Sequence, residues 1–289
     1  MPYEPGRVTK RRTDSCTPSS VSSVRHWGLR YRAHNGVRRW AVVVVPGELG
    51  PDNPPPPLPL VISPHGRGVR AQTNARLWRE LPARGPFIVI CPGGMGRRLP
   101  LHSWGWKGQI DDLARMPAIL RESRPWLRVD PQRVYAVGGS MGGQETLLLV
   151  GRHPRLLAGA VAFDSVTDFG LRYEQFARVP RTRALQALAR IEVGGTPRTN
   201  PEAYRLRSPV HWVEEVARSG VPLQVWWSDA DEIVVDQRTQ SARFFAELQR
   251  HEPRGRVEKV TGSWSHTAES YARLQLPGAV SWLGLDSDA

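Results

Sequence analysis

Short apolar runs alternate with longer amphipathic segments along most of this chain. The runs are four to six residues long and contain few polar residues, which is typical of strands buried on both faces. The alternation predicts an α/β fold with a mostly parallel central sheet and helices on both of its faces. The predicted strands are Leu60–Ser63, Phe87–Cys91, Val134–Val137, Ala158–Phe163, Leu223–Trp227 and Val257–Val260, and the predicted helices are Asn74–Leu81, Gln109–Ser123, Met141–Val150, Gln237–Gln249 and Ala268–Leu274.

Two extended runs precede this alternation. They are Trp27–Ala33 and Val37–Val45, and they flank His34-Asn35-Gly36. Asn-Gly between extended runs is a strong β-hairpin signal. The hairpin is expected to add antiparallel strands at one edge of the sheet.

Length and composition predict one folded domain. The chain has 289 residues, 40% of them hydrophobic, which is enough for one sizeable core. The polar, Ser/Thr-rich residues 1–24 are expected to be a disordered leader, and residues 25–289 a single domain. Within it, residues 165–220 are rich in Arg, Pro and Tyr and are expected to form an irregular insert that covers part of the site.

The formal net charge of +13 raises the question of nucleic-acid binding. Only three of the 40 basic residues are lysines, and the arginines are spread along the chain rather than gathered into a patch. We therefore expect no nucleic-acid partner. No apolar stretch is long enough to span a membrane, and the N-terminal residues lack the apolar core of a secretion signal. A cytoplasmic protein is expected, with Cys16 and Cys91 as free thiols.

Gly138-Gly139-Ser140-Met141-Gly142 matches G-x-S-x-G, the pattern of a nucleophilic serine. Such a serine lies on a sharp turn between a strand and a helix, where flanking glycines avoid steric collision. The pattern alone is weak in a chain with 27 glycines, but here it directly follows a predicted strand and opens a predicted helix. The alternative is a glycine-rich turn with a helix-capping serine. We predict that Ser140 is the nucleophile.

A serine nucleophile needs a histidine as general base, and one histidine has the required position. His266 follows the late strand Val257–Val260 by a short turn, so its imidazole can reach a serine at the same edge of the sheet. The other downstream histidines end a helix or lie in less structured segments: His153, His211 and His251. The alternative for His266 is a solvated loop histidine.

The acid that orients this histidine is expected after the strand Leu223–Trp227. Asp231 is the preferred candidate because a residue or two of turn lets its side chain swing inward. Asp229 competes with it but can cap the turn instead, and Glu232 is expected to face solvent. Asp164, after the preceding strand, is a further alternative.

Backbone N–H groups for an oxyanion hole are expected in the segment His65-Gly66-Arg67-Gly68, which directly follows a predicted strand. The residue after the nucleophile, Met141, would supply one N–H group and Arg67 the other, with Gly68 as the alternative to Arg67. A plain glycine turn is the competing interpretation.

These segments resemble the catalytic domain of the prolyl oligopeptidase (S9-like) branch of the α/β hydrolases. The resemblance covers roughly Pro59 to Leu274. It implies an α/β-hydrolase fold and places the family's nucleophile, acid and base on Ser140, Asp231 and His266. It rests on Pro131-Gln132-Arg133-Val134-Tyr135-Ala136-Val137-Gly138-Gly139-Ser140-Met141-Gly142-Gly143, Asn200-Pro201-Glu202-Ala203-Tyr204, Ser208-Pro209, and Asp231 with Ile233-Val234.

The sequence also departs from the family pattern. It has no room for the propeller of the larger members, so the esterase branch without a propeller is the expected match. Ser228 stands where the family usually has Gly before the acid turn, and Val235 where it usually has Pro. Arg67 stands where Gly is common, which affects the geometry of the oxyanion hole.

Eleven tryptophans are a high number for this length. Trp104, Trp106 and Trp264 lie near the predicted catalytic segments and are candidates for the walls of a substrate pocket, with core packing as the alternative.

Taken together, these features predict a serine hydrolase that needs no metal or cofactor. The expected reaction is hydrolysis of a small-molecule carboxylic ester through an acyl-enzyme. A small peptidase or amidase acting on a peptide-like substrate uses the same triad and is the alternative. A non-catalytic binding protein on a hydrolase scaffold is the alternative from another class.

Overall fold

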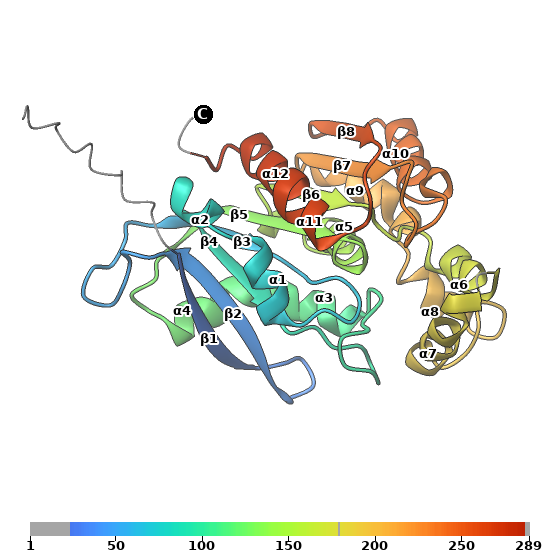
Figure 1. Cartoon of the computed structure of the whole chain (residues 1–289), viewed down its shortest axis with the longest axis horizontal. Helices are drawn as coiled ribbons and strands as arrows, with labels where there is room; N and C mark the ends of the chain where they lie inside the picture. The colour runs from blue at the N-terminus through green and yellow to red at the C-terminus, as the bar shows by residue number, and fades with distance from the viewer. Residues whose placement is uncertain (1–23, 179, 287–289) are drawn as a thin grey trace, which may run out of the picture.

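An eight-stranded sheet forms the centre of the protein (Figure 1). The computed structural model describes residues 24–178 and 180–286. The strand order across the sheet is β1-β2-β4-β3-β5-β6-β7-β8. The strands are β1 (Val24–Arg32), β2 (Arg38–Pro46), β3 (Leu58–Ile62), β4 (Ile88–Pro92), β5 (Val129–Gly139), β6 (Gly159–Phe163), β7 (Leu223–Ser228) and β8 (Val257–Gly262).

The strand directions confirm the predicted α/β-hydrolase fold. β3 to β8 pair in parallel, whereas β1 pairs with β2, and β2 with β4, in antiparallel fashion. The predicted hairpin is present, and the amide of Gly36 donates to the carbonyl of Ala33 in its turn. Gly36 has φ of 78°, a backbone conformation that glycine adopts without a steric penalty.

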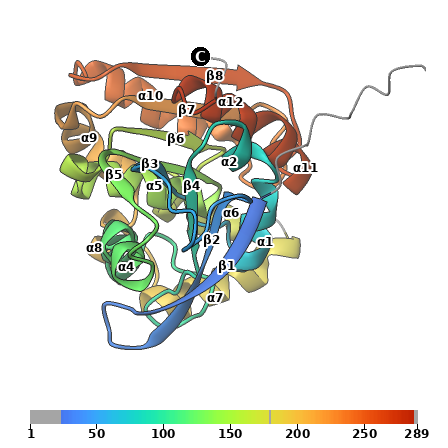
Figure 2. The same ribbon diagram turned by 90° about the vertical axis from the view of Figure 1, so that its left-hand side faces the viewer.

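Helices cover both faces of the sheet (Figure 2). Alternate residues of each buried strand point to opposite faces, so Ile62 and Ile90 belong to one apolar core and Val61 and Val89 to the other. On the first face lie α3 (Lys107–Ala114), α4 (Met116–Ser123), α5 (Met141–Arg152), α9 (Val213–Ser219) and α10 (Ser241–Arg250). On the second lie α1 (Ala71–Leu77), α2 (Leu81–Arg84) and α12 (Leu276–Trp282).

The prediction of an irregular insert at residues 165–220 is wrong, because this segment is mostly helical. Its helices are α6 (Phe169–Arg178), α7 (Arg183–Val193), α8 (Pro201–Arg205) and α9. In α6 the buried residues Phe169, Tyr173 and Phe176 recur at helical spacing. They form a third apolar cluster, in which Trp104 stacks on Phe169 with ring centroids 5.5 Å apart. The high content of arginine and proline concealed this apolar stripe.

Two further boundaries differ from the predictions. The segment predicted as one helix, Gln109–Ser123, is two helices that meet at Arg115, just before Pro117 in the first turn of α4. The last helical segment does not end at Leu274: it continues through a π-helical turn, Tyr271–Gln275, into α12.

The predicted leader, residues 1–24, lies outside the described residues except for Val24, where β1 begins, and Cys16 lies outside them as well. Cys91 is a buried free thiol. Within the part of the chain that the structure describes, no helix is long and apolar enough to cross a membrane.

Candidate active site

Ser140 lies at the junction of β5 and α5, on a strained turn. Its φ and ψ are 59° and −123°, which a residue with a side chain adopts only where the surroundings hold it there. Its amide donates to the carbonyl of Phe163 on the neighbouring strand at 2.8 Å. A Cβ on Gly138 would come within 2.5 Å of the carbonyl oxygen of Gly142, so the turn requires glycine there. The backbone thus presents Ser140 at the carboxyl end of β5.

The loop after β3, residues 64–68, is the candidate oxyanion loop, and its packing on this turn predicts the effect of Gly142→Ala. A Cβ at Gly142 would collide with the carbonyl oxygen of Pro64, which belongs to the backbone and cannot rotate away. We expect the free energy of unfolding to fall by about 1–3 kcal/mol, measured by urea denaturation. Gly151→Ala on the same helix is the matched control, because its Cβ would meet side-chain atoms of Trp212 and Val216 at 3.3 Å or more and no backbone atom at collision distance. Equal stability of the two variants would contradict this packing.

His266 and Asp231 lie on the loops after β8 and β7. Nδ1 of His266 is 3.0 Å from Oδ2 of Asp231, and a carboxylate only accepts, so Nδ1 carries the proton of this hydrogen bond. The other donors to Asp231 are the amides of Ile233 and Val234 and the side-chain amide of Gln237, each at 2.9 Å.

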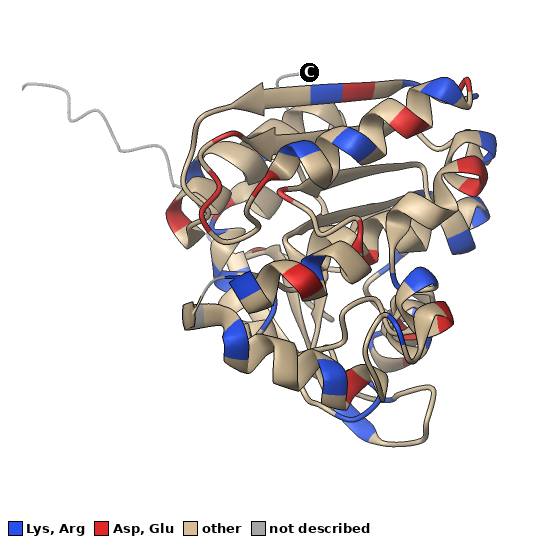
Figure 3. Ribbon diagram, turned by 90° about the vertical axis from the view of Figure 1, so that its right-hand side faces the viewer, with Lys and Arg blue, Asp and Glu red and all other residues tan. Residues whose placement is uncertain are grey.

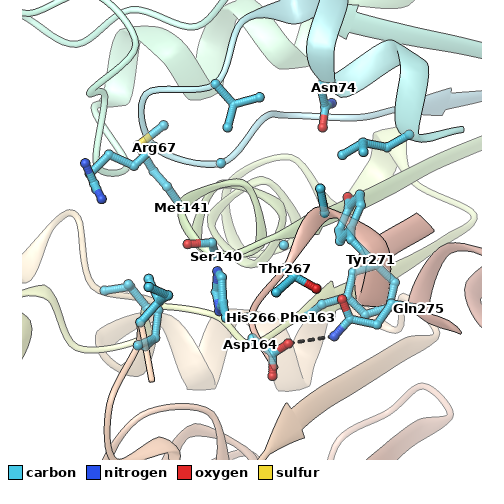
Figure 4. Close-up of a pocket in the computed structure, with 18 of the residues that line it drawn as sticks. Arg67, Asn74, Ser140, Met141, Phe163, Asp164, His266, Thr267, Tyr271 and Gln275 are labelled. Carbon is cyan, nitrogen blue, oxygen red and sulfur yellow. Dashed lines mark hydrogen bonds between the residues drawn. The ribbon is translucent and has the colours of Figure 1, made fainter. Parts of the chain in front are cut away.

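These hydrogen bonds keep Asp231 ionised. Burial opposes ionisation of this carboxyl group, but the hydrogen bonds from His266, Gln237 and the Val234 amide outweigh burial and hold the pKa of Asp231 below its usual value. Figure 4 shows the imidazole of His266 beside the side chain of Ser140, and both residues line the same pocket. The structure therefore brings together the three predicted catalytic side chains.

The alternative acid, Asp164, is also close to this imidazole. Ligand atoms of Asp164, Asp231 and His266 all lie within 4.8 Å of one another. Asp164 accepts from the amide of Ser228, the indole of Trp264 and the side chain of Gln275 at 2.6–2.9 Å. Burial raises its pKa. Asp164 therefore accepts three hydrogen bonds from donors other than the imidazole.

The two remaining acid candidates, Asp229 and Glu232, are both exposed.

Asp164, Asp231 and His266 have converging ligand atoms of the kind that can hold a metal ion. However, the oxygens of Asp164 and Asp231 accept six hydrogen bonds from amide, indole and backbone N–H donors as well as the one from His266. This donor-rich environment suits carboxylates that orient a histidine better than carboxylates that bind a cation.

The candidate oxyanion loop after β3 passes close to Ser140. A Cβ on Gly66 would lie 3.9 Å from the Cβ of Ser140. Gly68 donates its amide to the carbonyl of Leu101 at 2.9 Å, which leaves the amide of Arg67 as the candidate on this loop. Met141 is the first residue of α5, so its amide has no acceptor within the helix.

His65 holds this loop in place, a role that the sequence analysis did not identify. Its Nε2 accepts from the amide of Gly94 at 2.8 Å, so the proton is on Nδ1, which donates to the carbonyl of Gly66 at 2.8 Å. Burial lowers the pKa of His65, which favours this neutral form. The sequence motif His-Gly is therefore explained by anchoring of the loop.

The pocket around Ser140 has a volume of about 250 Å³. Of the three predicted pocket tryptophans, Trp104 lines it, whereas the other two do not. Trp264 instead donates to Asp164, and Trp106 packs against the guanidinium of Arg207. The other lining residues include several that were not predicted: Asn74, Phe163, Val166, Arg172, Phe176, Ile233, Val234, Thr267, Tyr271 and Gln275.

Comparisons with solved structures place this fold among known hydrolases. An S-formylglutathione hydrolase from Staphylococcus aureus aligns with a TM-score of 0.64 and 16% identity over 91% of this chain and 99% of its own. An esterase from Rhizomucor miehei aligns with 0.68 and 13% over 91% and 84%. An acylaminoacyl peptidase from Pyrococcus horikoshii aligns with 0.66 and 14%, over 91% of this chain but 41% of its own.

A sequence comparison with curated proteins gives no significant match. The sequence profile of the prolyl oligopeptidase family, by contrast, matches residues 104–268, which is more than half of the chain and includes all three candidate catalytic residues. The chain therefore belongs to the prolyl oligopeptidase family, a family of serine hydrolases with the α/β-hydrolase fold.

Proposed function

We propose that this protein is a carboxylic ester hydrolase that works through an acyl-enzyme. The observation that carries the proposal is the alignment of three groups: Ser140 on its strained turn, the His266 imidazole beside it, and Asp231 on Nδ1 of that imidazole. This arrangement activates a serine hydroxyl toward a carbonyl carbon.

The reaction follows from the geometry. Oγ of Ser140 attacks the ester carbonyl carbon, and its proton passes to Nε2 of His266 while Asp231 holds Nδ1–H. The amides of Met141 and Arg67 stabilise the negative oxygen of the tetrahedral intermediate. The intermediate collapses, the C–O bond to the alcohol breaks, and His266 protonates the leaving oxygen. A water molecule then attacks the acyl-enzyme by the same sequence and releases the acid.

A peptidase or amidase on the same triad is the second candidate, favoured by the structural similarity to an acylaminoacyl peptidase. An enzyme that anchors a peptide amine needs a free acidic group in its pocket. The acidic side chain lining this pocket is Asp164, and its oxygens already accept three hydrogen bonds. Turnover of 4-nitrophenyl butyrate against butyryl 4-nitroanilide separates the two functions, and we expect the ester to be strongly preferred.

Labelling with a fluorophosphonate tests for an activated serine without any assumption about the substrate. We expect Oγ of Ser140 to displace fluoride and form a covalent adduct, located by mass spectrometry of peptides. Ser140→Ala should abolish labelling, whereas Ser123→Ala at the end of α4 should leave it unchanged. No adduct on folded protein would favour the third candidate, a binding protein on a hydrolase scaffold.

A further inference from the structure

Two arginines line the pocket around Ser140. Arg67 comes from the oxyanion loop, and Arg172 from α6 of the insert. In Figure 4 the side chain of Arg67 extends to one side of Ser140, while Tyr271 and Gln275 lie on the other side. Both arginines thus lie away from the helical turn before α12, where the acidic lining residue Asp164 accepts a hydrogen bond from Gln275.

Arg172 is a buried cation without a carboxylate partner. Two other arginines are buried in the part of the chain that the structure describes, and each has a partner: Arg39 lies 3.2 Å from Asp112, and Arg207 lies 3.2 Å from Glu192. Arg172 is only 5% exposed, yet among the described residues no carboxylate oxygen lies within 4.0 Å of its guanidinium nitrogens.

The contacts that Arg172 does make are with neutral groups. Nη1 donates to the side-chain oxygen of Gln175 at 3.3 Å, Nη2 donates to the carbonyl of Ile233, and the guanidinium lies 4.5 Å from the ring centre of Phe176. These contacts fix its orientation, and the charge of Asp231, which lies beyond ion-pair distance, offsets part of its positive charge. Burial lowers the pKa of Arg172 to about 10, so it remains protonated at neutral pH.

Arg67 adds a second positive charge to the same pocket. It is half-buried, and within the described part of the chain it forms no ion pair. Repulsion from Arg67 contributes to the lowered pKa of Arg172, whereas attraction from Asp231 opposes the lowering and is the larger of the two charge effects. Two like charges kept together in a pocket with apolar walls are stabilised when an anion binds between or beside them.

We infer that the substrate carries a carboxylate, and that Arg172 and Arg67 bind this group while Ser140 attacks the ester carbonyl. The inference rests on the proposed ester hydrolysis and names its substrate class. A guanidinium presents paired N–H donors that match the two oxygens of a carboxylate. The net charge of +13, with Lys and Arg positions on many elements in Figure 3, adds only a general attraction for anions.

A pair of matched esters tests this inference. We expect kcat/KM for mono-(4-nitrophenyl) adipate to exceed that for 4-nitrophenyl adipamate by about tenfold to hundredfold, after subtraction of the enzyme-free rates. The same comparison with 4-carboxyphenyl and 4-carbamoylphenyl butyrate places the anion on the alcohol side. A preference for the anion in either pair, reduced toward unity in Arg67→Gln and Arg172→Gln, supports the inference.

The control variant is Arg133→Gln, an exposed arginine in the N-terminal half of β5, away from the end that carries Ser140. It removes one positive charge without touching the pocket, so the ratio of the two rates should stay at the parental value. An equal fall in this control would assign the preference to the general field and overturn the inference. Should Arg172→Gln fail to fold, Arg67→Gln carries the test, because Arg67 is only half-buried.

A binding measurement keeps the inference separable from the proposed function. Calorimetry on Ser140→Ala is expected to show binding of adipate but not of adipamide, with affinity reduced about tenfold in the double variants that also lack Arg67 or Arg172. Adipate binding without any ester turnover would support the anion site and count against the proposed hydrolase. Turnover of neutral esters without adipate binding or anion preference would retain the hydrolase and overturn the anion site.

Discussion

Ester hydrolysis by His266→Ala is expected to fall by about 10⁴-fold in kcat/KM. Without the imidazole, the Ser140 hydroxyl has no group to take its proton, and the leaving alcohol has none to supply one. The variant should fold, because His266 lies on a loop and is only partly buried. Hydrolysis of 4-nitrophenyl butyrate measures the loss, and circular dichroism verifies the fold.

His251→Ala provides the comparison for this prediction. His251 is an exposed residue at the end of α10, and it does not line the pocket. Its replacement should change kcat/KM by less than twofold, within the range of an ordinary surface substitution. Should His266→Ala retain more than a tenth of the parental rate while folded, another base would have to serve Ser140, and the assignment of His266 would fail.

The segments nearest the chemistry are those that the sequence predicts best. The turn that carries Ser140 and the loops that carry Asp231 and His266 follow the parallel strands β5, β7 and β8, whose carboxyl ends meet at one edge of the sheet. The order of apolar runs therefore suffices to bring Ser140, Asp231 and His266 together. No long-range contact has to be known in advance.

Features that depend on packing between distant segments were not predictable in this way. In the sequence, Arg172 looks like one of many arginines in a basic insert. Only the fold shows that Arg172 lines the pocket, whereas Arg39 and Arg207 form ion pairs with carboxylates. Trp264 is next but one to His266 in sequence, yet its indole turns toward Asp164 rather than into the pocket. Sequence proximity to a catalytic residue thus does not establish contact with the substrate.

Asp231→Asn is expected to lower kcat by about 10²- to 10⁴-fold. It should also lower the free energy of unfolding by about 1–3 kcal/mol, because Oδ2 of Asp231 accepts from Gln237 as well as from His266. An asparagine retains one acceptor oxygen, but its NH₂ group can face Nδ1 of His266 and favour the wrong tautomer, so the imidazole can no longer accept the proton of Ser140. Asp164→Asn, by contrast, should lower kcat by less than tenfold. It should lower the free energy of unfolding by about 1–3 kcal/mol, because the side chain loses acceptor capacity for Trp264 or Gln275.

Measuring kcat and urea denaturation on both variants and on the double variant distinguishes the two acids. A larger loss of kcat in Asp164→Asn than in Asp231→Asn would transfer the orienting role to Asp164. Comparable, modest losses in the single variants, with a much larger loss in the double variant, would mean that the two carboxylates substitute for each other beside one imidazole. The expected pattern is a large loss of kcat confined to Asp231, because its Oδ2 is 3.0 Å from Nδ1 of His266 and the oxygens of Asp164 are occupied by three other donors.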